Sequence, residues 1–368
     1  LRGGLDGLAL AAPIGDPAYA ALRGRLAIPA AGEGAGLPLD GFFSLNAAMP
    51  ALHALYAKKQ ALVLHATASP YRGRSHFDGQ DVLESGLGGV GRADDGWLNR
   101  ALSGLAAAGR ADAPKGLALA AVVPLVMRGA APVLTWTPPA YRLPLRSDTI
   151  DRLTDLYAAT DPALLKAFAA GLEIDRMSDS TAPAKDAAAS KGVGGQPFRE
   201  FTAAAEAAAR FFTTPGGPRI GALSVDGWDT HANQGPVKGL FANRLAGLDA
   251  AIAAFERGMS VHWRDTVVVL VTEFGRTVSA NGTDGTDHGT ATTALVAGGA
   301  VAGGRVLADW PGLSASALHE GRDLAPTRDL RSVFKGILRD HLGIPDGVLA
   351  SRVFPDSASA PPLGGLVS

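Results

Sequence analysis

Carboxylate and imidazole side chains follow several short apolar segments of this chain. They are Asp6, Asp226, Asp229, His231, Glu273, Asp287 and His288. Carboxylate oxygens with a few imidazole nitrogens suit Zn or Mn, and a carboxylate-rich set also suits Mg or Ca. Acids that gather in one cleft without a cation resist ionising together. These residues therefore predict a divalent metal site if the fold brings them together, and they leave the identity of the metal open.

The strands that precede these residues should decide where they lie. Three short apolar segments, at 61–65, 220–225 and 266–272, have the composition of buried parallel strands. In an open parallel sheet, ligands bind beyond the carboxyl ends of the strands. Asp226 directly follows the second segment and Glu273 the third, so we expect both side chains at the same edge of the sheet.

Each acid also has an interpretation that needs no metal. Asp284 and Asp287 lie in the stretch GTDGTDHG, where Asp is expected because its side chain stabilises turns. For each of these acids taken alone, a role in a turn is favoured over a role as a metal ligand. The metal interpretation depends on the joint occurrence of these residues after strands.

The order of the elements predicts an α/β fold. Apolar residues recur at helical spacing in 201–212 and 240–257, and these segments alternate with the strand-like ones. Such alternation indicates a central, mostly parallel sheet with helices on both faces. We expect one domain over residues 1–354, a mobile connector or insertion at 178–196, and a flexible tail at 355–368.

Composition argues against several classes of protein. Lys and Arg number 34 and Asp and Glu 35, for a formal net charge of −1, whereas a nucleic-acid-binding protein usually has a basic face. No apolar run approaches the roughly 20 residues of a membrane span. The absence of Cys excludes thiolate catalysis and Cys-based zinc sites. We expect no nucleic acid partner and no membrane span, and the oligomeric state stays open.

Several sequence blocks resemble those of a known family. They are LRGGLDGL, RSHFDGQD, DGWL, VDGWDTH, VTEFGRT, GTDGTDHGTAT, VAGGAVAGG and RDLAPTRDLRSVF. From Leu1 to about Phe354 they resemble an uncharacterised family of exported bacterial proteins, domain of unknown function 1501. That family is related to the alkaline-phosphatase-like superfamily, which includes sulfatases, phosphopentomutase and cofactor-independent phosphoglycerate mutase.

This resemblance implies an alkaline-phosphatase-like α/β fold and export. The protein would then be periplasmic or extracellular and would carry a Tat signal. The chain begins without a signal peptide, so we expect that an upstream segment has been removed.

The metal ligands of the superfamily have matching positions here. An Asp at the end of its first strand, which binds one metal, is similar to Asp6. Its D-x4-H block, which binds the other, matches Asp226 and His231. Its later His matches His288 and would complete the site of Asp226 and His231.

The match for the second metal site is incomplete. The superfamily has an Asp-His pair at a strand end where this chain has Glu273 and Phe274. Glu can replace Asp as a ligand, but Phe cannot replace His. An alternative register places the pair at Asp287 and His288 and selects nearly the same residues.

The superfamily nucleophile, a Ser, Thr or modified Cys at a helix N-terminus, corresponds to the stretch SPYRGRSHFD. Ser75 is the candidate, because a helix end favours an anion and a metal can activate a hydroxyl. A strict register instead places Ser75 and His76 on the Gly-His pair that follows the nucleophile. It then puts Arg72, which cannot serve, at the nucleophile position. Ser75 can equally cap a helix that begins near His76.

Arginine and histidine side chains near these blocks could support catalysis. Arg72, Arg74 and Arg276 could clamp a phosphate or sulfate group, since a guanidinium matches its geometry. Each could equally be an ordinary surface residue. His65 ends a strand-like segment at the same edge and is a further candidate as a ligand or as a support for one.

Two functions fit these observations. The first is an exported metal-dependent hydrolase of small phosphate or sulfate esters, in which the metal assists attack by Ser75 or by water. The second is a metal-holding envelope protein of the same fold without hydrolytic activity, which Phe274 favours. A nucleotide-binding protein is disfavoured, because the glycines at 86–91 do not follow a convincing strand.

Overall fold

The computed structural model describes residues 1–91, 93–107, 115–137, 147–162, 164–166, 168–169, 171–172 and 196–368. The connector predicted at 178–196 lies outside the described residues except for its last position. Within the described residues, no helix has the combined length and apolarity needed to cross a membrane.

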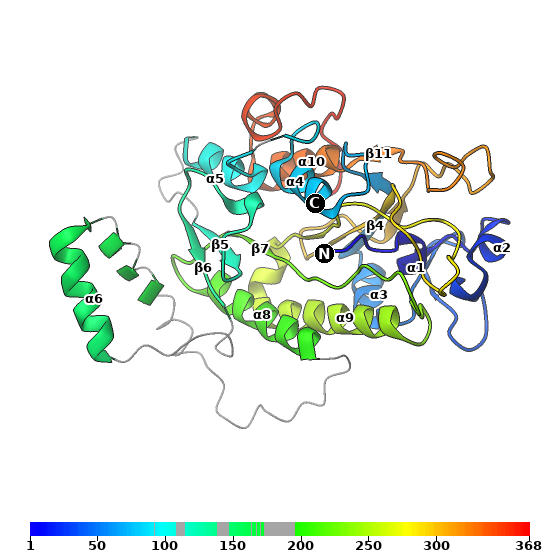
Figure 1. Ribbon diagram of the computed structural model, residues 1–368, viewed down its shortest axis with the longest axis horizontal. Helices are drawn as coiled ribbons and strands as arrows, with labels where there is room; N and C mark the ends of the chain where they lie inside the picture. Colours follow the sequence, from blue (N-terminus) through cyan, green and yellow to red (C-terminus); the bar gives the residue numbers. More distant parts are fainter. Residues whose placement is uncertain are drawn as a thin grey trace.

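A five-stranded sheet forms the centre of the fold (Figure 1). Its strands are β4 (Ala61–Ala68), β8 (Val268–Leu270), β9 (Thr292–Ala297), β10 (Arg305–Leu307) and β11 (Arg328–Asp329). Four of them lie in the order β10-β4-β9-β8, and β11 also pairs with β4. The strand β4 is parallel to β10 and β11, whereas β9 is antiparallel to both β4 and β8.

The prediction of a mostly parallel central sheet is therefore wrong for this sheet, which is mixed. The segment between β8 and β9 contains a long loop and no crossover helix among its residues. Strands joined in this way can pair antiparallel, whereas parallel neighbours need a crossover. The glycine-rich stretch that contains His288 thus lies before an antiparallel strand.

Two smaller sheets flank the central one. The first is fully parallel, in the order β6-β5-β7, and the second is antiparallel, in the order β1-β3-β2. Their strands are β5 (Gly116–Leu119), β6 (Val133–Thr135), β7 (Ile220–Leu223), β1 (Ala11–Ala12), β2 (Leu37–Pro38) and β3 (Ser44–Leu45). The fold is mixed α/β and includes a parallel sheet, as the sequence predicts at this coarser level.

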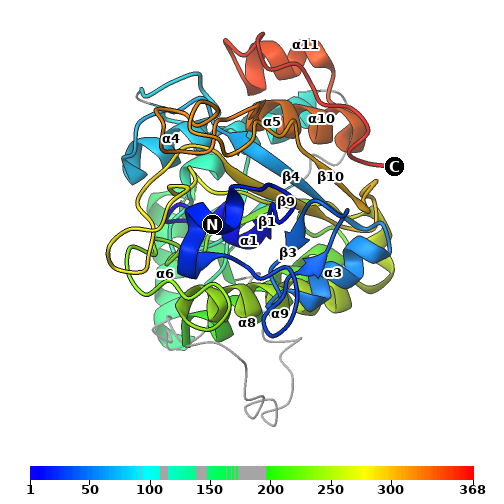
Figure 2. The same ribbon diagram turned by 90° about the vertical axis from the view of Figure 1, so that its right-hand side faces the viewer.

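Helices cover both faces of the central sheet (Figures 1 and 2). On one side are α3 (Pro50–Ala57), α8 (Gln196–Thr213) and α9 (Leu240–Met259), and on the other are α4 (His76–Ser85), α5 (Trp97–Ala107) and α10 (Leu330–Leu342). Other α-helices are α1 (Gly7–Leu10), α2 (Tyr19–Arg23), α6 (Ser147–Thr160) and α11 (Asp346–Val348).

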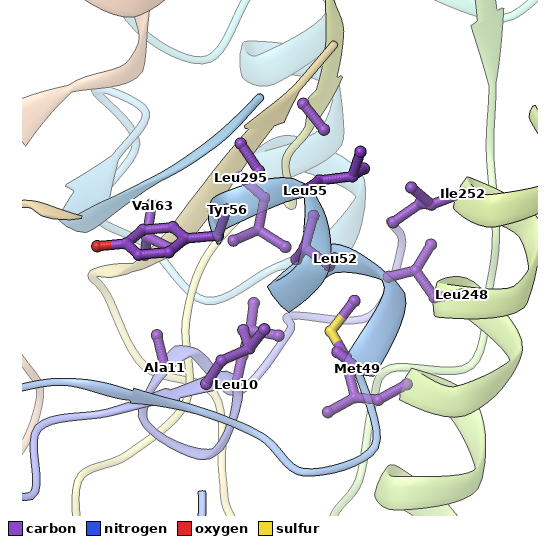
Figure 3. Packing of buried hydrophobic residues seen from close by; sticks show 14 of the residues in the cluster. Leu10, Ala11, Met49, Leu52, Leu55, Tyr56, Val63, Leu248, Ile252 and Leu295 are labelled. Carbon is purple, nitrogen blue, oxygen red and sulfur yellow. The ribbon is translucent and has the colours of Figure 1, made fainter. Parts of the chain in front are cut away.

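Alternating side chains of β4 and β9 fill a separate core on each face. Val63 and Leu295 pack with Leu52 of α3 and Leu248 of α9 (Figure 3). Their neighbour Leu62 points the other way and packs with α5 and α10. Burial of each such side chain contributes about 1.5–3 kcal/mol, so the strands carry the loops at their ends on a rigid base.

The C-terminal segment packs against the domain, unlike the flexible tail predicted at 355–368. The ammonium group of buried Lys335 donates hydrogen bonds of 2.8 and 2.9 Å to the carbonyls of Ser357 and Ala360. Leu366 is fully buried in the core formed by α5 and α10. The Pro, Ser and Gly residues that suggest flexibility here form turns held by a buried lysine, a contact with no local signal in the sequence.

Candidate metal centre

Loops at one edge of the sheets carry the candidate ligands. His76 is the first residue of α4, after the C-terminal end of β4. Asp229 and His231 follow β7, and His288 lies between β8 and β9. Since β9 runs antiparallel to β8, its beginning lies at the same edge as the end of β8.

The N-terminal residues hold two of these loops together. The amide of Arg2 donates to the carbonyl of Val225 at 2.8 Å, and the amino group of Leu1 donates to the carbonyl of Val271 at 2.8 Å. Gly3 has a φ of +122°, and a Cβ at this position would lie 2.5 Å from the backbone nitrogen of Asp229. Only glycine permits this approach, so the LRGG stretch sets the position of the loop with Asp229.

Imidazole nitrogens and one carboxylate converge at this edge. One ligand atom from each of His76, Asp229 and His288 lies within 4.8 Å of the others. The Asp229 carboxylate lies 3.1 Å from His288 Nε2, 2.9 Å from His231 Nε2 and 3.4 Å from His76 Nε2. A tetrahedral metal site with bonds of about 2.0–2.1 Å separates its ligand atoms by about 3.3 Å. The positions of the His76, Asp229 and His288 ligand atoms therefore fit one metal ion, and His231 lies beside them.

Each imidazole is oriented by an acceptor at its Nδ1 atom. His76 Nδ1 lies 2.9 Å from Glu273 Oε1, His231 Nδ1 lies 3.1 Å from Asp287 Oδ1, and His288 Nδ1 lies 2.9 Å from the Arg74 carbonyl. Because these acceptors have no proton to donate, each Nδ1 donates the hydrogen bond, and Nε2 is the ring nitrogen that faces the Asp229 carboxylate. Metal-binding histidines in proteins are usually held in this way.

The Nε2 atoms crowd together around the Asp229 carboxylate, and one of them has no hydrogen-bond partner among the described residues. His76 Nε2 is buried and has no hydrogen-bond partner among the described residues. The Nε2 atoms of His231 and His288 lie 3.1 Å apart, where two lone pairs repel each other unless a cation or a shared proton lies between them. A buried imidazole nitrogen left unpaired costs about 1–3 kcal/mol. The donor set therefore fits a divalent metal of the borderline class, such as Zn.

Glu273, which the sequence presents as a ligand, lies behind His76 instead. Its carboxylate accepts hydrogen bonds from the Gly3 amide at 2.9 Å, Gln80 Nε2 at 3.1 Å and Thr272 Oγ1 at 2.7 Å. Burial opposes ionisation, but these hydrogen bonds outweigh it and hold the pKa of Glu273 below its ordinary value. Glu273 is thus an ionised acceptor that fixes the ring of His76.

Removal of the Glu273 charge should weaken metal binding without removing a ligand. For Glu273→Gln we expect about 10- to 100-fold lower metal affinity, the usual effect of losing the partner behind a metal-binding histidine. Competition with a chromophoric chelator measures this change. A loss of all bound metal, equal to that of His76→Ala, would show instead that Glu273 is a direct ligand.

Arg276 holds Asp229 and is not available as an anion clamp. Its side chain is 0% exposed and donates at 2.5 Å to Asp229 Oδ1. Its remaining donors reach the hydroxyl and carbonyl of Thr286 and the carbonyl of Gly3. Burial would raise the pKa of Asp229, but the hydrogen bond and charge of Arg276 and the nearby His231 outweigh this and lower it.

Two further predicted ligands lie outside the convergent group. Asp6 caps α1 and forms a buried ion pair with Arg23, so its oxygens are already engaged. Asp226 is exposed. Its charge acts on the amino group of Leu1 and raises the pKa of that group, against the larger opposing effect of burial. Among the described residues, no hydrogen bond or ion pair joins either carboxylate to the three histidines. The structure thus places Asp229, and not Asp226, beside His231.

Asp287 lies at the exposed side of the centre. It is held by His231 and by Asn281 Nδ2 at 3.3 Å. Burial opposes ionisation, but the hydrogen bonds from these two residues outweigh it and lower the pKa of Asp287. The loop approaches closely at Gly285, where a Cβ would lie 2.2 Å from the carbonyl carbon of His231. The stretch GTDGTDHG therefore forms a tight loop and at the same time carries residues of the candidate metal centre, so the two interpretations do not exclude each other.

The residues proposed around the nucleophile have other contacts. Ser75 is the N-cap of α4, and its Oγ accepts from the Asp78 amide at 3.4 Å. Arg72 donates to the carbonyls of Ser69 and Tyr71. The helix-cap interpretation of Ser75 is therefore the one the local geometry favours.

Arg74 contributes through its backbone. Its guanidinium is held by Glu320 at 2.6 Å and Asp323 at 3.0 Å, and its carbonyl orients His288. The hydrogen bond that its guanidinium donates to Glu320 raises the pKa of Arg74 above its ordinary value.

His65 and Phe274, which lie close to the candidate ligands, have structural roles. His65 is fully buried, and its Nε2 donates to the carbonyl of Ala11 at 2.9 Å. Burial lowers the pKa of His65 to about 4, so it stays neutral. Phe274, which follows Glu273, packs its ring 4.8 Å from that of His76 and 5.1 Å from that of His288. It forms the apolar base of the centre.

Some supporting residues escape the sequence analysis. Gln234 Nε2 donates to Asp6 at 2.5 Å, and Gln234 Oε1 accepts from Thr286 Oγ1 at 2.8 Å. Thr286 in turn binds Arg276, so a continuous chain of polar contacts links Asp6 to Asp229. No spacing signals such a chain. The pair Asp229 and His231 does carry a signal, since residues two apart in extended backbone share a face.

A comparison with protein families now identifies the kind of protein. Residues 50–353, most of the chain, match the family described as "Protein of unknown function (DUF1501)". The chain belongs to the DUF1501 family. Comparisons with curated proteins and with solved structures find no match. His76, Asp229 and His288 all lie within the part that matches DUF1501.

Proposed function

We propose that this DUF1501 protein is a metal-dependent hydrolase of small phosphate or sulfate esters. His76, Asp229 and His288 would hold the metal as three protein ligands, with His231 beside the open fourth position on the solvent side. One observation carries the proposal: three imidazoles, each with Nδ1 fixed by an acceptor, direct Nε2 at the same carboxylate. A relation to alkaline phosphatases and sulfatases, and a periplasmic or extracellular location, belong to the same proposal.

The centre is open on one side, as a catalytic site requires. The side chains of Asp229 and His231 are 39% and 45% exposed, so water and a small substrate can reach them. Catalytic metal sites keep an open position, whereas structural ones are closed. A bound divalent metal would supply polarisation of an ester oxygen and a lowered pKa for a bound water.

Side chains around the open position would orient the reaction. Asp287 fixes the ring of His231, Arg276 fixes the carboxylate of Asp229, and the ring of Phe274 packs against that of His76. Since Ser75 caps α4, we assign the attack to water and not to Ser75.

Metal analysis and an ester panel test this proposal. We expect about one equivalent of divalent metal in the purified protein by elemental analysis, and turnover of aryl phosphates or aryl sulfates that a chelator abolishes and metal restores. His76→Ala and His288→Ala should lose the metal. His262→Ala, at an exposed histidine remote from the centre in sequence, is the matched control and should keep it.

A metal-holding protein without turnover is the second candidate. Ser75 caps a helix, and both Arg74 and Arg276 are engaged by carboxylates, so three of the predicted catalytic groups have other roles. Metal bound at full stoichiometry without turnover of any ester would favour this candidate and would leave the site assignment intact.

A further inference from the structure

One guanidinium next to the loop that carries Asp229 has no hydrogen-bond partner within the described part of the chain. Arg244 lies near the beginning of α9, and its Nη1 atom is buried without a partner among the described residues. No ion pair or hydrogen bond of its other nitrogens occurs within the described part of the chain. The loss of hydration of an unpaired guanidinium costs more than that of a neutral group, so a residue kept in this state calls for a ligand.

The guanidinium of Arg244 packs against the loop that carries Asp229. Gly227 has a φ of +100°, and a Cβ there would lie 3.2 Å from Arg244 Nη2 and 3.3 Å from Cζ. The guanidinium thus rests against the backbone two residues before Asp229. Burial lowers the pKa of Arg244 and the charge of Asp229 raises it, so the two groups act on each other, and arginine remains protonated throughout.

Other arginines at the centre are already engaged. Arg276 is held by Asp229, Arg74 by Glu320 and Asp323, and Arg322 donates to Asp323 and to the carbonyl of His288. Each of these three guanidinium groups is thus bound to a carboxylate, although Arg74 Nε is itself buried without a partner among the described residues. Arg244 differs from all three because no carboxylate pairs with it in the described part of the chain, and its planar fork matches the oxygens of phosphate or sulfate.

We propose that Arg244 is the substrate-binding residue of this centre and holds the anionic oxygens of a phosphate or sulfate group beside the metal ligands. This assignment rests on the proposed function, because it takes the metal centre as the reacting site. It also narrows the substrate class to esters that keep a negative charge on the group next to the metal. A neutral ester offers no acceptor of comparable strength to the guanidinium.

Inorganic phosphate and inorganic sulfate serve as probes in titration calorimetry with the metal-loaded protein. We expect Arg244→Gln to weaken phosphate binding about 10- to 100-fold, the usual contribution of a charged hydrogen-bond pair. Metal content should stay at the wild-type level. Arg244→Lys keeps the positive charge, so we expect this variant to fold. It loses the planar guanidinium, so we expect it to bind phosphate with an affinity between those of the wild type and Arg244→Gln. Arg264→Gln, at an exposed arginine beyond the other end of α9, should have no effect.

The outcomes separate this inference from the proposed function. Equal phosphate affinity of wild type, Arg244→Gln and Arg244→Lys, at equal metal content, would overturn the role of Arg244 and leave the hydrolase proposal standing. Phosphate binding that persists unchanged after removal of the metal would also overturn it, since the anion would then bind elsewhere. If the wild type turns over no ester but binds phosphate in an Arg244-dependent manner, the hydrolase fails and the anion site stands.

Discussion

Substitution of Asp229 by alanine is expected to abolish metal binding while substitution of Asp226 leaves it unchanged. The carboxylate of Asp229 contacts the Nε2 atoms of His76, His231 and His288. Loss of a residue that supports a metal ligand lowers metal affinity by up to about 100-fold. Loss of Asp229, a ligand itself, should lower the affinity by more than that. Elemental analysis of the purified variants and titration with Zn measure the effect.

The two aspartates form a matched pair for this experiment. They lie three residues apart in the same loop, and both are exposed to some degree. Asp229→Asn keeps an acceptor for Arg276, so it separates loss of the charge from disturbance of the buried guanidinium. We expect it to lose most of the metal and to stay folded. Full metal content in Asp229→Ala together with loss of metal in Asp226→Ala would restore the D-x4-H ligand pattern and reject the present site.

The second large effect concerns stability. Asp6→Ala should lower the free energy of unfolding by about 3–5 kcal/mol, because it leaves a buried cation without its partner. The side chains of Asp6 and Arg23 are 1% and 0% exposed, so water cannot replace the lost carboxylate. The same substitution removes the cap that accepts from the amides of Leu8 and Ala9. Denaturation by urea, followed by circular dichroism, measures the loss.

A double substitution provides the control for Asp6. Asp6→Leu combined with Arg23→Met removes both charges, and replacement of a buried pair by apolar groups is often close to neutral. We expect this variant to be more stable than Asp6→Ala. The folded fraction of Asp6→Ala should bind metal at the wild-type stoichiometry. A folded but metal-free Asp6→Ala protein would return Asp6 to the list of ligands.

The assignment of Asp6 and Asp229 shows how buried arginines select among carboxylates. Both residues follow the same rule in the sequence, an acid after a short apolar segment. Arg23 neutralises Asp6 within the core, so no oxygen of Asp6 is left for a metal. Arg276 engages one oxygen of Asp229 and leaves this side chain facing the histidines. Neither arginine is close in sequence to its partner, so no local pattern predicts which acid is engaged.

Part of the fold was predictable, because strands and helices follow local periodicity. The strand expected at 61–65 and the helix expected at 240–257 correspond to β4 and α9, because their patterns arise from side chains only a few residues apart. The central strand β9 was not among the expected strands. The direction of β9 was not predictable in the same way. It depends on how the loop before it returns along β8, which is a property of pairing between distant segments.

The sequence by itself indicated which chemistry is available to this protein: histidines and acids that follow strands, and no cysteine. Only the tertiary structure decided which of these residues act together. It brought His76 from the start of α4 to the carboxylate of Asp229, placed Glu273 behind that histidine, and left Asp226 in solvent. The physical reason is that the type of a ligand is local, whereas its orientation depends on hydrogen bonds and buried charges supplied from distant parts of the chain.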